Sequence, residues 1–232
     1  MRVNGGKESE VIAQCGKRSR ATHEKITAFR FPHVSGVCVS PTFPSQSVPS
    51  PKKLAHVVMR TPRYTEMVNF YRTVFNASTA FENESLTFLT YDDEHHRFAF
   101  LNAPGLADPA PGTAGVHHIA FTYDSIGELV VTYERLAEGG IHPVWCTNHG
   151  TTTSMYYRDP DGTQLELQVD NFETIEEIER FLTTQDFMEN PIGVDFDPAV
   201  LASRFHSGEP EEALKRRTPM GPRSFDETVK IR

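Results

Sequence analysis

The sequence has little of what marks a secreted or membrane-spanning protein. Its 232 residues include only three cysteines, Cys15, Cys38 and Cys146, too few for a disulfide framework. No apolar run approaches the ~20 residues that a membrane-spanning helix needs. The first residues also lack the apolar segment of a secretory signal. We therefore expect a cytoplasmic protein in a reducing compartment, with no membrane partner.

Basic charge is scarce beyond the first 50 residues. The whole chain has a net charge of −8, whereas seven basic and three acidic side chains give residues 1–50 a charge of +4. The remainder therefore carries −12, which argues against nucleic acid as the main partner. The sequence also lacks a nucleic-acid-binding motif and a phosphate-binding loop.

Residues 1–50 are predicted to be a disordered arm. They are rich in Ser, Pro, Gly and basic residues, and they show no sustained hydrophobic period. Such a composition has too few apolar side chains to offset the entropy of ordering. A basic, serine-containing start is also typical of an organellar transit peptide, although three glutamates and the absence of a clear amphipathic face argue against one.

Residues 51–170 contain one pattern twice. The first repeat, about 53–103, predicts a strand at 53–59, a helix at 64–75, and strands at 79–82, 86–91 and 97–101. The second, about 116–170, predicts a strand at 116–121, a helix capped by Asp124-Ser125, and strands at 143–147, 154–158 and 164–169. Six pairs of similar residues, beginning with His56 and His118, are each separated by 62 positions. This is an internal βαβββ repeat. We predict an α+β fold in which two modules form one curved mixed sheet, or half-barrel, around a metal cavity.

Residues 171–232 are predicted to be a helical C-terminal extension. Thr174 and Glu177 form a capping-box pattern that opens a helix through about Thr184. Further short helices are expected at 198–205 and 209–216.

Three side chains in the repeats have the chemistry of metal ligands. His56 and His118 occupy equivalent positions in the two first strands, and Glu166 lies within the last strand of the second repeat. Taken singly, a strand histidine is usually a core residue and a strand glutamate usually faces solvent. If the two modules enclose one cavity, however, all three can meet there. Two imidazoles and one carboxylate with open positions suit non-haem Fe(II), with Mn(II) or another divalent metal as the alternative.

Other polar residues lie near these ligands in the sequence. His149 precedes a Gly-Thr-Thr-Thr run, Tyr156 precedes the turn 159–162, and His96 begins the last strand of the first repeat. A histidine beside a metal-bound acidic substrate can transfer a proton, and a tyrosine hydroxyl can stabilise a substrate oxygen. We interpret the remaining histidines in these modules as structural or solvent-exposed: His95, His117 and His142.

Together these motifs resemble those of the vicinal oxygen chelate, or glyoxalase-like, superfamily. The segments that carry the resemblance are 54–56, 117–121, and 157–162 followed by Glu166. Within the superfamily, segments 148–157 and 190–198 are similar to small two-module type I extradiol ring-cleavage dioxygenases of the biphenyl-2,3-diol dioxygenase kind. The resemblance covers roughly residues 52–222 and leaves the N-terminal arm outside it.

The resemblance implies an activity and a role for each candidate residue. The activity is cleavage of a catechol-type aromatic diol by dioxygen with Fe(II), and a homo-oligomer is compatible with it. The implied iron ligands are His56, His118 and Glu166. His149 would donate a proton as the O–O bond breaks, and Tyr156 and His96 would lie around the substrate, with Tyr157 as the competing choice for the tyrosine.

Three alternatives share this fold. A divalent-metal epimerase, isomerase or thiol transferase would use the same ligands without needing His149 and Tyr156. A metal-free module would only bind a small molecule. A glyoxalase I enzyme would need a fourth protein ligand, and our pairing of the repeats places Phe100 at the position that corresponds to Glu166.

Overall fold

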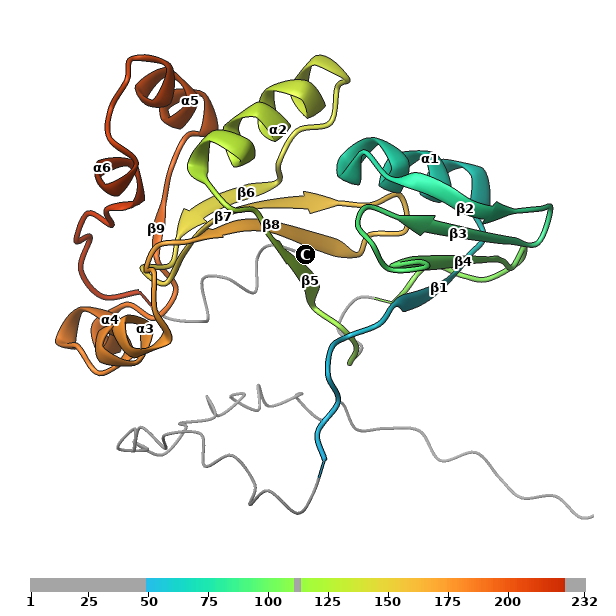
Figure 1. The fold of residues 1–232 in the computed structure, drawn as a ribbon, viewed down its shortest axis with the longest axis horizontal. Helices are drawn as coiled ribbons and strands as arrows, with labels where there is room; N and C mark the ends of the chain where they lie inside the picture. Colours follow the sequence, from blue (N-terminus) through green and yellow to red (C-terminus); the bar gives the residue numbers. More distant parts are fainter. Residues whose placement is uncertain (1–48, 111–113, 224–232) are drawn as a thin grey trace, which may run out of the picture. The chain divides into compact units, whose positions relative to one another are not determined.

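The computed structural model describes residues 49–110 and 114–223, which form two mixed β-sheets with helices (Figure 1). The predicted α+β fold is therefore confirmed. The strands lie in two separate sheets, whereas the sequence predicted one curved mixed sheet. The predicted arm lies outside the described residues except for its last two positions.

The first sheet is built by the first repeat. Its elements are β1 (Val57–Thr61), α1 (Tyr64–Phe75), β2 (Ser78–Glu82), β3 (Leu86–Thr90) and β4 (Phe98–Asn102). The strand order is β1-β4-β3-β2, with β1 parallel to β4 and the other neighbours antiparallel. Helix α1 forms where the sequence predicted it. The buried side chains Met67, Val68, Tyr71 and Val74 recur at helical spacing, so one face of α1 is buried in the core.

The second sheet repeats this plan. Its elements are β5 (His118–Thr122), α2 (Ile126–Glu138), β6 (Trp145–Asn148), β7 (Thr152–Arg158), β8 (Gln164–Asp170) and β9 (Val194–Asp195). The order is β5-β8-β7-β6-β9, so the first four strands match those of the first sheet. Of the predicted cap pair Asp124-Ser125, it is Ser125 that caps α2, by accepting a hydrogen bond from the Glu128 amide. Strand β9, from the C-terminal extension, was not predicted.

Polar contacts connect the modules, among them the ion pair of Arg63 with Asp161 at 2.9 Å. The Tyr71 hydroxyl of α1 donates to Asp159, 3.0 Å away in the turn between β7 and β8. Arg135 of α2 donates to the carbonyl oxygens of Thr73 and Val74 at the end of α1. The two repeats therefore share a buried boundary between their helices and the 159–162 turn.

The structure corrects two details of the first repeat. The first strand begins at Val57, because its partner β4 begins at Phe98 and the preceding residues have no ladder partner. His56 thus lies just before the strand. In addition, Val58 pairs with Ala99 as Ala120 pairs with Glu166, so Ala99, and not Phe100, corresponds to Glu166. Neither residue supplies a fourth metal ligand.

The C-terminal extension is mainly helical. It contains α3 (Ile175–Leu182), α4 (Gln185–Glu189), α5 (Pro198–His206) and α6 (Glu211–Lys215). The capping box of Thr174 and Glu177 is confirmed. The helix predicted through Thr184 ends earlier, because the Thr184 hydroxyl accepts from the Phe187 amide and caps α4 instead.

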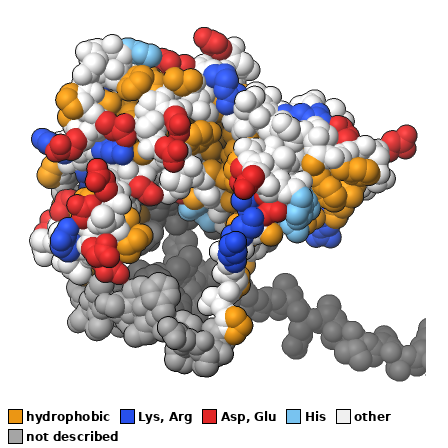
Figure 2. All heavy atoms as spheres, in the orientation of Figure 1, with side chains coloured by type: hydrophobic (Ala, Val, Ile, Leu, Met, Phe, Trp, Pro, Cys, Tyr) orange, Lys and Arg blue, Asp and Glu red, His pale blue; other side chains and the backbone are white. Residues whose placement is uncertain are grey.

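Acidic and basic side chains are interspersed on the surface that Figure 2 shows. Several form ion pairs, such as Arg63 with Asp161 at 2.9 Å and Arg204 with Glu209 at 2.6 Å. Among the described helices, none is long and apolar enough to cross a membrane.

Candidate active site

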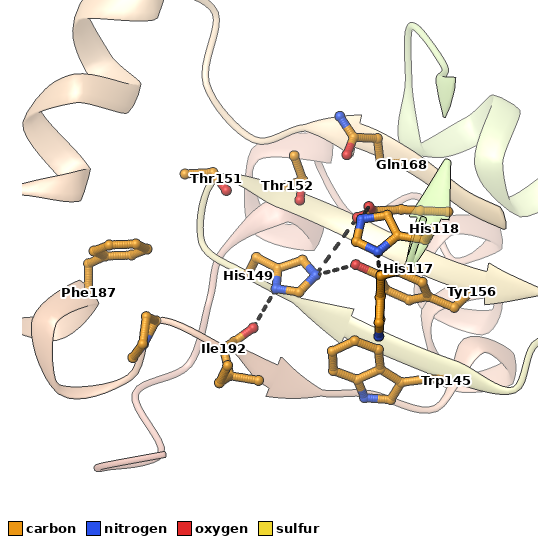
Figure 3. A pocket seen from close by; sticks show the side chains of 12 residues that line it. His117, His118, Trp145, His149, Thr151, Thr152, Tyr156, Gln168, Phe187 and Ile192 are labelled. Atoms are coloured by element: carbon orange, nitrogen blue, oxygen red, sulfur yellow. Dashed lines mark hydrogen bonds and ion pairs between the residues drawn. The ribbon is translucent and has the colours of Figure 1, made fainter. Parts of the chain in front are cut away.

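A cavity of about 510 Å³ lies against the second sheet (Figure 3). Its walls come from β5 to β8 and from the C-terminal extension. Histidine, tyrosine and glutamate side chains line the sheet side, and an apolar group lies on the side of the extension. The lining residues are His117, His118, Trp145, His149, Thr151, Thr152, Tyr156, Glu166, Gln168, Phe187, Pro191 and Ile192.

Strand register places the central side chains in one row. Trp145 pairs with Tyr156, Tyr156 pairs with Glu166, and Glu166 pairs with Ala120. Directly paired residues point to the same face of a sheet, and His118, two residues before Ala120, shares that face. The alternate residues of β8, Leu165 and Leu167, are buried in the core instead. One face of β8 therefore stabilises the fold and the other lines the cavity.

Glu166 is a buried carboxylate held between two histidines. Its Oε2 lies 3.0 Å from His118 Nε2, and its Oε1 lies 3.8 Å from His149 Nε2. Burial alone would raise the pKa of Glu166. Hydrogen bonds from His118, Ser154 and Tyr156 outweigh burial, so its pKa lies below the usual value. The site thus contains a carboxylate that stays ionised at neutral pH.

The His149 ring is held at both nitrogens. Nδ1 contacts the carbonyl oxygen of Ile192, and Nε2 lies 2.9 Å from the Tyr156 hydroxyl. A carbonyl oxygen can only accept, so Nδ1 carries the proton and neutral His149 presents an unprotonated Nε2. Burial lowers the pKa of His149 and favours this neutral form. Burial, and next the Glu166 charge, raises the pKa of Tyr156, which therefore keeps its proton.

Several cavity residues were missed by the sequence analysis. Trp145 stacks on Tyr156 with ring centroids 4.7 Å apart, and its Nε1 donates to Asp195 at 2.8 Å. His117 is exposed, in line with its interpretation, but it also lines the cavity, and its Nδ1 lies 2.8 Å from His118 Nδ1. Pairing of the strands 143–147 and 154–158 could have placed Trp145 beside Tyr156. No local pattern points to Phe187 or Ile192, because the fold of the extension brings them here.

The other predicted site residues form a histidine cluster in the first module. The His56 ring lies 4.3 Å from that of His96 and 6.3 Å from that of His95. His96 is buried and stacks on Phe88, with centroids 4.3 Å apart. Burial, together with the neighbouring His56, lowers the pKa of His96. His142 is exposed, in line with its interpretation.

The structure thus brings together four of the six predicted site residues: His118, His149, Tyr156 and Glu166. His56 and His96 do not line this cavity. Within residues 49–110 and 114–223, no three His, Cys, Asp or Glu side chains are grouped closely enough to hold a metal ion. The three-ligand site and the role of His96 stay predictions.

Comparison with known proteins identifies relatives. Residues 53–167 match the family model described as the Glyoxalase/Bleomycin resistance protein/Dioxygenase superfamily. Biphenyl-2,3-diol 1,2-dioxygenase 2 of Rhodococcus globerulus is 44% identical over 163 residues, or 70% of this chain and 86% of the relative. Biphenyl-2,3-diol 1,2-dioxygenase 3 of the same organism is 41% identical over 71% of this chain and 88% of the relative. A solved glyoxalase/dioxygenase from Nostoc punctiforme is 21% identical, with a TM-score of 0.45 over 53% of this chain and 97% of that one.

Proposed function

Because this chain belongs to the glyoxalase/bleomycin resistance protein/dioxygenase superfamily, we propose that it is an Fe(II)-dependent extradiol dioxygenase. Its substrates would be a catechol-type aromatic diol and dioxygen. The two relatives described above act on such a diol by name. The observation that carries the proposal is the convergence of His118, Glu166, His149 and Tyr156 on one cavity.

The side chains of the cavity fit the expected metal at two positions. An imidazole nitrogen of His118 and a carboxylate oxygen of Glu166 lie 3.0 Å apart at the sheet face of the cavity. These are ligand types that ferrous iron accepts. His56 would be the third ligand, and for this its side chain must leave the contact with His96. When bound, the ion would lower the pKa of catechol hydroxyls and bring the diol and dioxygen together.

His149 and Tyr156 would handle protons. Since Nε2 of His149 is unprotonated in the neutral ring, it is ready to take a proton from a diol hydroxyl before it gives one back. The sequence analysis predicted proton transfer by such a histidine, and the resemblance implied the second step. The Tyr156 hydroxyl, which keeps its proton, can donate a hydrogen bond to a substrate oxygen.

The apolar side of the cavity would hold the aromatic ring. Trp145, beside Tyr156, and Phe187 and Ile192, from the extension, offer flat or branched apolar surfaces to the cavity. They would orient the ring and exclude water from the reacting oxygens. A cytoplasmic location and a homo-oligomeric state belong to the same proposal.

Oxygen uptake tests the proposed function. After anaerobic loading with Fe(II), the protein is mixed with oxygen and a panel of catechols that differ in ring substituents. E166Q and H118A should lose turnover, whereas the matched surface variants E176Q and H142A, which change exposed residues, should keep it. If the iron-loaded wild type does not consume oxygen with any of the catechols, the dioxygenase assignment is wrong.

One observation favours a second function. Since His56 does not line the cavity, the chain could instead be a metal-free module that binds an aromatic molecule. Bound iron and tryptophan fluorescence, measured on the same Fe(II)-loaded samples, distinguish the two. A metal-free module would retain no iron, yet it would bind catechols, with a change in the fluorescence of Trp145, the chain's single tryptophan.

A further inference from the structure

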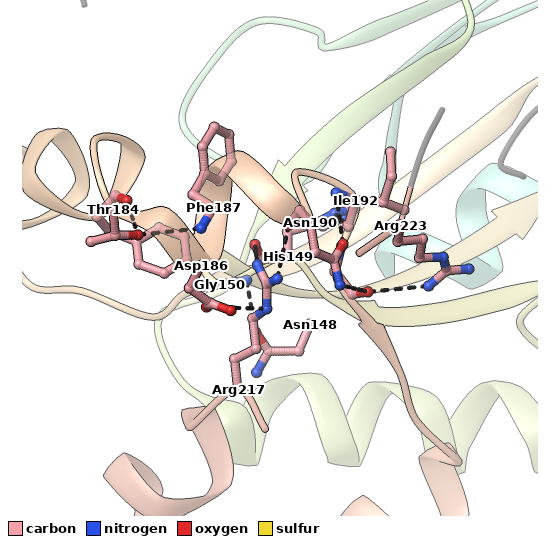
Figure 4. Close-up of polar contacts among 12 residues, drawn as sticks. Asn148, His149, Gly150, Thr184, Asp186, Phe187, Asn190, Ile192, Arg217 and Arg223 are labelled. Carbon is pink, nitrogen blue, oxygen red and sulfur yellow. Dashed lines mark hydrogen bonds and ion pairs between the residues drawn. The ribbon is translucent and has the colours of Figure 1, made fainter. Parts of the chain in front are cut away.

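Arg217, which follows α6, has a buried cationic side chain. The side chain is only 4% exposed. Its Nη1 donates to the carbonyl oxygen of His149 at 3.0 Å, and its Nη2 donates to that of Asn190 at 2.8 Å (Figure 4). Its Nε lies 3.7 Å from Asp186, and the guanidinium lies 5.9 Å from the Phe181 ring centroid. Because burying a charge is costly, filling space alone is a poor reason for an arginine here.

The two carbonyl groups that Arg217 bridges belong to the two segments that hold the His149 ring. One is the backbone of His149 itself. The other belongs to Asn190, whose side-chain oxygen accepts from the amides of Ile192 at 3.2 Å and Gly193 at 2.8 Å. Asn190 Nδ2 also donates to the Gly193 carbonyl at 3.0 Å. This closed turn sets the direction of the Ile192 carbonyl, which accepts the Nδ1 proton of His149.

We propose that Arg217 is a positioning residue for His149. By joining the His149 and Asn190 carbonyl groups, its guanidinium fixes the backbone of His149 relative to the Ile192 carbonyl. This keeps the proton on Nδ1 and directs Nε2 toward Tyr156 and Glu166. A guanidinium suits the task because its rigid fork reaches two acceptors at once. The catalytic consequence rests on the proposed function, whereas the effect on the ring does not.

Nitrogen NMR of the histidine rings tests the effect on the ring in the metal-free protein. Wild type should show His149 protonated at Nδ1 only, near neutral pH. In R217M the ring should populate both tautomers or broaden by exchange. R216M is the matched control, because the Arg216 side chain is 72% exposed and pairs with Glu212 on the surface. A wild-type His149 spectrum in folded R217M overturns the proposal.

Kinetics test the consequence for catalysis. With Fe(II) and a catechol, R217M should reduce kcat about 10–100-fold and change KM less than threefold, since small displacements of a catalytic group cost this much. In an H149F background the same substitution should change kcat less than twofold, because the group it positions is gone. An equal loss in both backgrounds would make Arg217 a general structural residue and overturn the proposal.

A second variant, R217K, keeps the proposal testable if R217M does not fold. R217K keeps the positive charge, but its ammonium lacks the fork that reaches both carbonyl groups, so it should behave like a milder R217M. If wild type does not oxidise any catechol, the proposed function fails, and the NMR comparison with R217K and R216M still decides the positioning role.

Discussion

The sequence identifies Glu166 as a site residue only when the internal repeat is considered as well. Alternation along 164–169 predicts that the side chain of Glu166 points to one face of the strand and those of Leu165 and Leu167 to the other, and this is correct. The same alternation, taken alone, predicts a glutamate in solvent. Instead its face of the sheet is covered, and Glu166 is 5% exposed. His118, on β5, and His149, before β7, lie against its carboxylate, and contacts from other segments of the chain leave no local pattern along β8.

Protonation of His149 should lower the stability of the metal-free protein at acidic pH. Burial lowers the pKa of His149 from its ordinary 6.5, so the unfolded chain binds this proton more readily than the folded one. The contribution of His149 to stability is therefore present above pH 6.5 and is lost as the pH falls through the folded-state pKa. The loss is at most about 1.4 kcal/mol per pH unit for one group.

Urea unfolding of wild type and H149F at pH 7.5 and 5.5, followed by Trp145 fluorescence, measures this effect. When the pH is lowered, the unfolding free energy of wild type should fall more than that of H149F. Glu166, His118 and Arg217 face the ring in both proteins, so the comparison isolates His149. An unchanged difference would mean that folding leaves the pKa of His149 unaltered.

Asp159, in the turn after β7, links the turn to the first module. Its Oδ1 accepts from the amides of Asp161 at 3.0 Å and Thr163 at 2.8 Å, and its Oδ2 accepts from buried Tyr71 at 3.0 Å. We predict that Y71F lowers the unfolding free energy by about 1–3 kcal/mol, because it leaves a buried carboxylate oxygen without this donor. Thermal or urea unfolding measures it. Y91F, at a residue 43% exposed, is the control and should change stability by less than about 0.5 kcal/mol.

At the scale of elements, the sequence predicted best where one period was sustained. Helix α1 has the predicted limits, because four apolar residues recur on its buried face. Helix α2 begins at the predicted cap pair, because the Ser125 side chain accepts from the Glu128 amide. Strand ends were less accurate. Strand β1 begins four residues later than predicted, because its limits depend on β4, a partner about 40 residues away. Strand β9 is too short to have a period.

Gly193 precedes β9 and connects the extension to the site. Its φ of +120° is strained for other residues, and an added Cβ would overlap the carbonyl oxygen of Asn148 and lie 2.8 Å from Thr147 Oγ1. We predict that G193A moves the 190–195 segment away from β6 and displaces the Ile192 carbonyl from His149. Turnover should then fall at least tenfold, with a loss of stability of about 2–4 kcal/mol.

The control for Gly193 is a glycine with positive φ and free space. Gly140 has a φ of +77°, and nothing lies within 4 Å of the position of its added Cβ. G140A should therefore cost only the backbone strain, about 1 kcal/mol, and keep turnover. Oxygen uptake and urea unfolding of both variants check the pair. Equal effects of the two substitutions would show that the close contact with β6 is unimportant.

At the scale of the whole molecule, the sequence predicted two equivalent modules, and the two sheets have matching strand order. What it could not predict is how the modules meet. The repeat aligns His56 with His118, but alignment says nothing of the distance between them. That distance depends on packing between the modules, of which Tyr71, Asp159 and Arg135 are part. The domain limits at about residues 50 and 170 stay predictions as well.

Metal binding should therefore be a property of both modules together. If Fe(II) is held by His56, His118 and Glu166, binding must draw His56 from its contact with His96 toward the second sheet. A ligand at 100 times its dissociation constant stabilises the folded state by about 2.7 kcal/mol. For a domain of this size, that corresponds to a rise in Tm of about 5–10 °C.

H56A, H118A and E166A should each lose most of this rise, and H95A, a neighbour of His56 in the cluster, should keep it. Anaerobic thermal unfolding with and without Fe(II), together with elemental analysis of bound iron, measures both effects. If H56A keeps the full rise and one iron per chain, the metal is held by the second module alone, and the repeat-equivalent histidine is not a ligand.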